Sequence, residues 1–182
     1  MKKTLALALA LIMLCLSAFT FVACGGDDDD TTTKEPTPIP TGYKKFDNGD
    51  IYFGYPDSWG KMEQDGVTII MGSASNNNIT VASEEKTNMY ETMDVDDFNL
   101  LIKPQLEGQG IAVSNVNISN VKNDNGIKIT KITLTASAYG ISMSQTLFIV
   151  STKDATYSVT VTEAQTEAGL VDTIFATLNY SK

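Results

Sequence analysis

The chain has 182 residues, with 13 Lys and Arg residues, 22 Asp and Glu residues, no His and a formal net charge of −9. All of its basic residues are Lys. The lack of His excludes Ser-His-Asp triads, Cys-His dyads and imidazole metal sites, and the lack of Arg excludes bidentate guanidinium binding of phosphate. So acidic a chain also argues against a nucleic-acid partner, because neutralising phosphates requires a basic surface.

The first 23 residues have the pattern of an export signal. Lys2 and Lys3 precede an uncharged apolar run that ends at Val22-Ala23-Cys24. This ending resembles the lipobox of bacterial lipoproteins. The resemblance implies that residues 1–23 are removed, that Cys24 is acylated, and that the lipid bilayer holds the protein at the extracytoplasmic face of the cell membrane. An ordinary signal peptide or an uncleaved signal anchor is the alternative.

Processing at Cys24 changes the chemistry of the remaining chain. Cys15 leaves with the signal, and an acylated Cys24 leaves no free thiol, which excludes disulfides and thiolate sites. Loss of Lys2 and Lys3 leaves 11 Lys against 22 acidic residues, a net charge of −11. The mature protein is therefore expected to be stable without disulfides.

Residues 24–42 read as the lipidated Cys followed by an acidic, Pro- and Thr-rich tether. The segment has too few apolar side chains to offset the entropy of ordering it, so no fixed structure is expected. The Asp27–Asp30 run is interpreted as a solvated, self-repelling spacer, with a calcium site as the alternative.

Residues 43–182 are the right length for one domain. Alternating apolar residues predict early strands over 51–55, 67–71 and around 79–81. An apolar stripe then predicts a helix over 95–103, with Asp94 as its N-cap. Pro104 is expected to kink or end this helix, because proline lacks an N–H and clashes with the preceding turn.

The second half of the chain returns to alternation. The apolar residues change parity twice, which predicts one bulge near Asn115 and a second near Thr130-Lys131. Thr162 and Gln165 fit a capping box and predict the start of a C-terminal helix. The later strands are expected over 111–118, 127–138, 141–149 and 155–161.

These elements predict an α+β fold. A mainly antiparallel sheet of about six to seven strands is expected, sandwiched with two helices, because hairpin turns join the later strands. The segment Tyr55-Pro56-Asp57-Ser58-Trp59, after an apolar strand, resembles the opening of the PsbP-like fold, which includes PsbP and the DcrB-like lipoproteins. The resemblance implies a binding or accessory module and no particular activity.

Two groups of residues are candidate sites. Tyr55 and Trp59 are a possible aromatic platform for a ligand, with packing at the sheet edge as the alternative. An acidic cluster is the candidate site for a divalent cation, with a solvated loop and helix start as the alternative. Its weak candidate ligands are Glu84, Glu91, Asp94 and Asp97.

The sequence leaves two functional hypotheses. The first is a membrane-anchored, non-enzymatic binding or accessory module of the bacterial envelope, without a cofactor, whose partner is an envelope protein or a small ligand. The alternative is a carboxylate- or metal-dependent hydrolase that acts on envelope glycans, with Glu91 and Asp94 as its acid/base pair. The alternative requires two carboxylates that converge in a pocket.

Overall fold

A computed structural model describes residues 35–72 and 76–181. The proposed signal, Cys24 and the Asp27–Asp30 run therefore lie outside the described residues. Within the described ranges, no helix is long and apolar enough to cross a bilayer.

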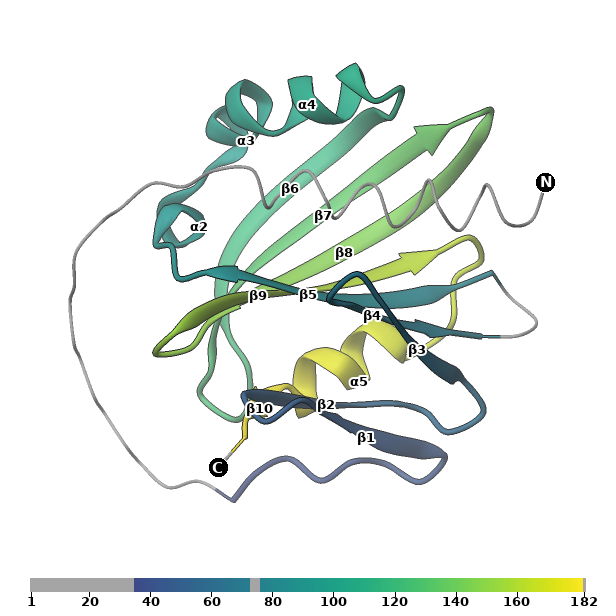
Figure 1. Cartoon of the computed structure of the whole chain (residues 1–182), viewed down its shortest axis with the longest axis vertical. Coiled ribbons are helices and arrows are strands. Elements are labelled where there is room, and N and C mark those ends of the chain that lie inside the picture. The colour runs from purple at the N-terminus through teal and green to yellow at the C-terminus, as the bar shows by residue number, and fades with distance from the viewer. Residues whose placement is uncertain (1–34, 73–75, 182) are drawn as a thin grey trace.

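The described residues form ten strands in two antiparallel sheets (Figure 1). The main sheet has seven strands in the order β3-β4-β5-β9-β8-β7-β6, and a smaller base sheet has the order β1-β2-β10. The main-sheet strands are β3 (Gly60–Gln64), β4 (Val67–Met71), β5 (Asn78–Glu85), β6 (Ala112–Lys122), β7 (Lys128–Ala138), β8 (Ile141–Ser151) and β9 (Ala155–Glu163). The base-sheet strands are β1 (Tyr43–Asp47), β2 (Ile51–Pro56) and β10 (Asn179–Tyr180). The predicted mainly antiparallel α+β fold is confirmed.

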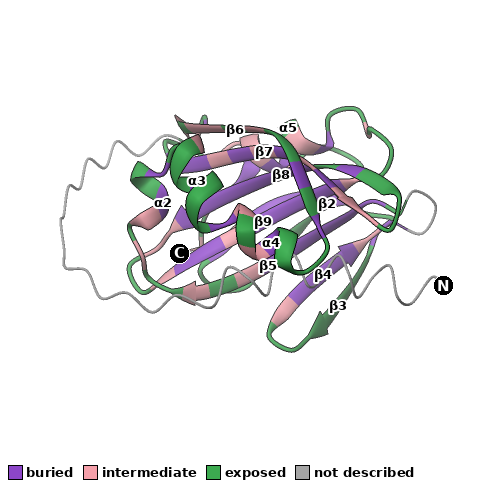
Figure 2. Cartoon of the chain, turned by 90° about the horizontal axis from the view of Figure 1, so that it is seen from above, coloured by how far each residue is buried: buried purple, intermediate pink, exposed green. Residues whose placement is uncertain are grey.

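The helices lie on opposite sides of the main sheet. The helical layer consists of α2 (Met89–Thr92), α3 (Val95–Leu101) and α4 (Lys103–Gly108), and it packs on β6 and β7. Helix α5 (Leu170–Thr177) packs on the other side, beside the base sheet. We call these sides the helical face and the base face of the main sheet. Figure 2 shows the exposed outer sides of α3 and α4 above the buried central strands.

Each face of the main sheet has its own apolar core. Phe148 and Val150 of β8 join α5 and the base sheet in one core, whereas Leu147 and Ile149 join the helical layer in the other. This arrangement corrects the second predicted bulge. Strand β7 pairs with β8 in unbroken register through Thr130 and Lys131. Its apolar residues change parity because the strand is buried on both faces, which alternation alone cannot distinguish from a bulge.

The first predicted bulge is confirmed. The register between β6 and β7 shifts between Ser114 and Asn117, and Asn115 has a φ of 54°. Asparagine tolerates this left-handed conformation better than most residues do. The extra residue moves Val113 and Ile118, which have opposite parity, onto the same side of the sheet.

The helix boundaries differ from the prediction. Asp94 caps α3 as expected, but Pro104 lies in the first turn of a further helix, α4, where its missing N–H costs no hydrogen bond. The predicted capping box at Thr162 is wrong, because Thr162 is still paired in β9. Helix α5 begins after Gly169, whose φ is 79°.

Asparagine side chains hold the backbone segments that precede and follow α5. The Oδ1 atom of Asn77 accepts hydrogen bonds from the backbone N–H groups of Ala164 and Gln165, which holds the segment between β9 and α5 against β5. The Nδ2 atom of Asn123 donates to the carbonyls of Phe175 (2.9 Å) and Leu178 (2.6 Å) at the end of α5. The turn at 123–126 is thus also a C-terminal cap for that helix.

The last tether residues before β1 lie against the domain. The backbone N–H of Thr37 donates to Oδ1 of Asn125 at 2.7 Å. The Cγ2 atom of Ile39 is 3.1 Å from the position that a Cβ on Gly54 would occupy. Glycine at position 54 thus permits the close approach of Ile39 to strand β2.

Candidate functional site

The helical face carries a row of polar side chains where β5, β9 and β8 lie side by side. In β9, Tyr157, Val159 and Val161 enter the core on the base face, so the residues between them lie on the helical face. Register aligns these with residues of β5 and β8, because directly paired residues share a face. The resulting polar stripe consists of Asn78, Thr80, Gln145, Ser158, Thr160 and Thr162.

Apolar side chains flank the polar stripe on both sides. On one side, Ile69 of β4 pairs with Thr80, and Met62 of β3 pairs with Ile69. On the other side, Leu147 of β8 pairs with Thr160 and contributes to the core beneath the helical layer. The helical face is therefore apolar, then polar, then apolar again across the strands. All six members of the stripe are uncharged, so this part of the face favours a neutral partner.

Gln145 is the residue of the polar stripe whose hydrogen bonding is incomplete. Its side chain is 2% exposed, and its Nε2 atom donates to Oγ1 of Thr162 at 3.1 Å. Its Oε1 atom is buried and accepts no hydrogen bond from any described residue. Turning the amide over would leave the N–H half without a partner instead. Because buried polar atoms are nearly always paired, this amide is suited to a site that a further group completes.

Glu84 stands at the end of the same face, opposite Thr156 of β9. The Tyr90 hydroxyl hydrogen-bonds to its carboxylate. Partial burial raises the pKa of the Glu84 carboxyl, and this hydrogen bond lowers it in part. Burial and the neighbouring Glu84 also raise the pKa of Tyr90. The pair places a protonatable carboxyl beside α2, at one end of the stripe.

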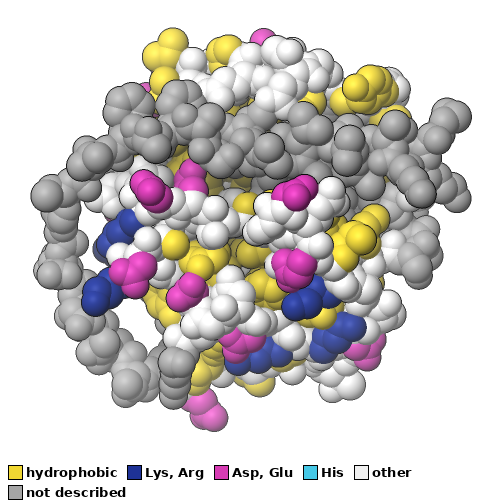
Figure 3. Space-filling view, in the orientation of Figure 1, with side chains coloured by type: hydrophobic (Ala, Val, Ile, Leu, Met, Phe, Trp, Pro, Cys, Tyr) yellow, Lys and Arg dark blue, Asp and Glu magenta, His cyan; other side chains and the backbone are white. Residues whose placement is uncertain are grey.

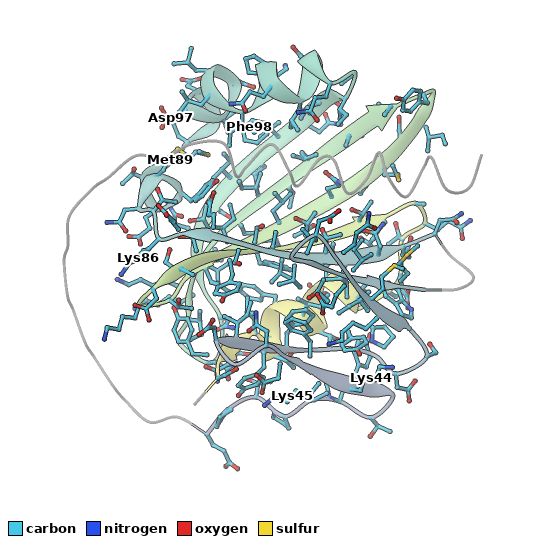
Figure 4. All side chains as sticks on the ribbon, viewed as in Figure 1. Lys44, Lys45, Lys86, Met89, Asp97 and Phe98 are labelled. Atoms are coloured by element: carbon cyan, nitrogen blue, oxygen red, sulfur yellow. The ribbon has the colours of Figure 1, made fainter. Side chains whose placement is uncertain are left out.

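The other predicted acidic residues do not converge on Glu84. Asp94 and Asp97 form the reciprocal capping box of α3, in which Oδ1 of Asp94 accepts from the backbone N–H of Asp97 at 2.9 Å. Glu91 is exposed on α2. Figure 4 shows Asp97 beside Phe98 at the helical end of the molecule. Within residues 35–72 and 76–181, no three His, Cys, Asp or Glu side chains lie close enough to hold a metal ion.

The geometry does not favour the paired-carboxylate hypothesis for hydrolysis. That hypothesis requires Glu91 and Asp94 to converge in a pocket, but both side chains are exposed and Asp94 serves as a helix cap.

Tyr55 and Trp59 do not form an exposed aromatic platform. Each side chain is 5% exposed and belongs to the core on the base face. Lys44 covers them, with its Nζ atom 5.1 Å from the Tyr55 ring centroid and donating to the carbonyls of Asp57 and Trp59. The segment packs because large rings gain more from burial than from contact with water.

A second group of polar contacts joins the C-terminus to the base sheet. Hydrogen bonds from Lys45, Ser181 and the Gly49 backbone lower the pKa of Asp47 to about 2. The Tyr157 hydroxyl donates to the carboxylate of Asp50, and burial followed by this bond raises the pKa of Tyr157 to about 12. These contacts close the end of the fold on the base face of the main sheet, which is the face opposite the polar stripe.

Sequence reasoning missed the polar stripe. In the sequence, Thr162 indicated a helix cap, and neither Thr160 nor Gln145 formed part of a motif. One signal was present: β9 is a central strand, yet one of its faces is entirely Ser and Thr. Finding the site requires the strand order, because it places β5 next to β9.

Comparison with known proteins identifies the fold alone. No family model and no curated protein matches the chain. A protein from Bacteroides thetaiotaomicron has a similar structure, with a TM-score of 0.50 and 15% identity over 78% of this chain. The match covers 50% of that protein, so this chain spans half its length. LpqN of Mycobacterium tuberculosis, described as involved in cell envelope biogenesis, matches with a TM-score of 0.39 and 13% identity over 77% of this chain and 91% of LpqN.

Proposed function

We propose that the protein is a lipid-anchored, extracytoplasmic module of the bacterial envelope that binds an uncharged ligand on the helical face without catalysing a reaction. The lipobox-like sequence ending at Cys24 supports the anchor, and the tether at 24–42 supports a domain set apart from the membrane. The observation that carries the binding role is the buried Oε1 atom of Gln145 in the polar stripe, which accepts a hydrogen bond from no residue that the structure describes.

The composition of the face limits the chemistry of the ligand. The polar stripe offers hydroxyl and amide groups and no charge, and Ile69 and Leu147 supply apolar surface on its two sides. A matching ligand is uncharged, extends across several strands, and places a hydrogen-bonding group at Gln145 between apolar contacts. A binding role is favoured over hydrolysis because the carboxylates at 91 and 94 do not converge.

The anchor is tested by metabolic labelling with a palmitate analogue. The wild-type chain is expected to incorporate the label and to fractionate with membranes, and Cys24→Ala is expected to lose both properties. Cys15→Ala is the matched control, since Cys15 lies within the predicted signal. Label and membrane fractionation that persist in Cys24→Ala would refute the anchor.

The binding site is tested by native mass spectrometry of the protein isolated from its own membranes. The wild-type protein is expected to carry a small molecule of defined mass. Gln145→Met keeps the length of the side chain but removes the amide. Loss of one hydrogen bond should weaken the affinity for the bound molecule roughly 5- to 10-fold, so a smaller fraction of the variant protein should carry it. Gln105→Met, on α4, is the matched control. Absence of a bound molecule, or equal occupancy in Gln145→Met, would contradict the proposal.

A further inference from the structure

The tether joins the folded domain at the base sheet. Strand β1 follows directly from residues 35–42, and the Thr37–Asn125 hydrogen bond and the Ile39–Gly54 approach hold that segment against the domain. The residues that the structure shows held against the domain therefore include Thr37. Twelve residues separate Cys24 from Thr37.

The base sheet and the helical layer lie at opposite ends of the long axis of the molecule (Figure 1). Figure 4 shows the same separation, with Lys44 and Lys45 at the base-sheet end and Met89 and Phe98 at the other. The polar stripe lies on the helical face, which is turned away from the base sheet. A surface that approaches from the tether side thus meets the base sheet first.

The reach of the tether is short compared with the domain. Twelve residues span at most roughly 40 Å, which requires full extension, and a random coil of that length would have a root-mean-square length of about 20 Å. A domain of 140 residues is about 37 Å across, from its expected radius of gyration of about 14 Å. Bringing the helical layer to the anchoring bilayer would require the tether to pass along the whole domain at nearly full extension.

We infer that the domain stands on its anchoring bilayer through the base sheet, with the helical face directed away from that membrane. The inference rests on the proposed lipid anchor at Cys24. The base-sheet end suits a headgroup surface, because Lys and acidic side chains are intermixed in that half of the visible face (Figure 3). Lys45, for example, is paired with Asp47.

This orientation restricts the source of the ligand. A molecule bound at the polar stripe must arrive from the aqueous compartment or from a component on its far side. Lipids of the anchoring bilayer lie beneath the base sheet and reach the helical face only if the domain tips over.

The test compares the distance of two surface positions from the bilayer. The acylated full chain, which then has no free thiol, is placed in vesicles of phosphatidylethanolamine and phosphatidylglycerol that contain a headgroup quencher. One fluorophore is attached at Lys45→Cys on β1 and, in a second sample, at Leu100→Cys on α3. Both side chains are exposed, so each labelled variant should keep the fold, and loss of the exposed Lys45–Asp47 pair should lower the melting temperature only slightly.

The expected result is quenching at position 45 that exceeds quenching at position 100 by about threefold or more, because the short tether keeps the base sheet near the lipid. Inserting about thirty Gly and Ser residues after Gly26 raises the root-mean-square reach to about 35 Å and should reduce the difference. Equal quenching at both positions, with acylation intact, overturns the orientation and leaves the anchor standing. Failure of the chain to be acylated or to join the vesicles overturns both.

Discussion

Replacing Asn123 with Ala is expected to destabilise the protein through the end of α5. The Asn123 side chain is 6% exposed and makes four hydrogen bonds. It donates to the carbonyls of Phe175 and Leu178, and it accepts from the backbone N–H groups of Asn125 (3.1 Å) and Ile127 (3.0 Å). At about 1 kcal/mol per hydrogen bond, less the part that water recovers at the partly buried partners, the expected loss is about 3 kcal/mol.

The assay is urea unfolding of residues 25–182 at neutral pH, analysed by linear extrapolation with the slope held common to all variants. Asp124→Ala is the matched control, because Asp124 lies in the same turn but is exposed. The control is expected to change the free energy of unfolding by less than about 0.5 kcal/mol. A loss below about 1 kcal/mol for Asn123→Ala would refute the view that this turn caps α5.

Three further predictions concern other contacts. Glu84→Gln should raise the urea midpoint at pH 7 relative to wild type but not at pH 4, because the raised pKa of Glu84 stabilises the fold below about 4.5 and that stability is lost as pH rises through the folded-state pKa; a variant effect independent of pH would contradict this. Asp47 should contribute stability that is present above about pH 4 and is lost as pH falls toward 2, because its pKa is lowered in the folded protein. Asp47→Asn should remove this pH dependence, so that the difference in the free energy of unfolding between wild type and variant is constant above about pH 5 and shrinks below about pH 4. Gly54→Ala should release the tether, since the new Cβ would lie 3.1 Å from Ile39, and limited proteolysis should then cut nearer to β1; Gly60→Ala, where a Cβ meets nothing, should leave the cleavage pattern unchanged.

The sequence predicts the fold class because alternation and turn residues are local signals. The helix cap at Asp94, for example, is set by a few neighbouring residues, and the structure confirms it. The second bulge could not be predicted correctly, because Ile129 and Ile132 enter different cores on the two faces of β7. Because α5 covers the base face of the sheet, Ile129 is buried there while Ile132 is buried on the helical face, and a regular strand accommodates both residues.

The candidate site is less accessible to sequence reasoning than the fold. Gln145 and Thr162 are 17 residues apart, and Thr80 lies 80 residues before Thr160. Their proximity depends on β9 being inserted between β5 and β8, which no local pattern indicates. By contrast, the acidic residues at 94–97 predicted a cation site because acidic residues cluster there in the sequence. In the structure, Asp94 and Asp97 form the capping box that starts α3.

The closing strand β10 has a consequence for how the protein is made. It pairs with β2, and α5 just before it supplies Leu170, Ile174 and Leu178 to the core shared with β2. The first and last segments of the domain thus complete one another, so this core can form only after the ribosome has synthesised the domain as far as Tyr180. A chain that stays open during synthesis is suited to passage through an export channel as an unfolded polypeptide. Accordingly, a chain ending at Glu163 should remain protease-sensitive at the base sheet, and protection of residues 43–56 in that truncated chain would contradict late closure.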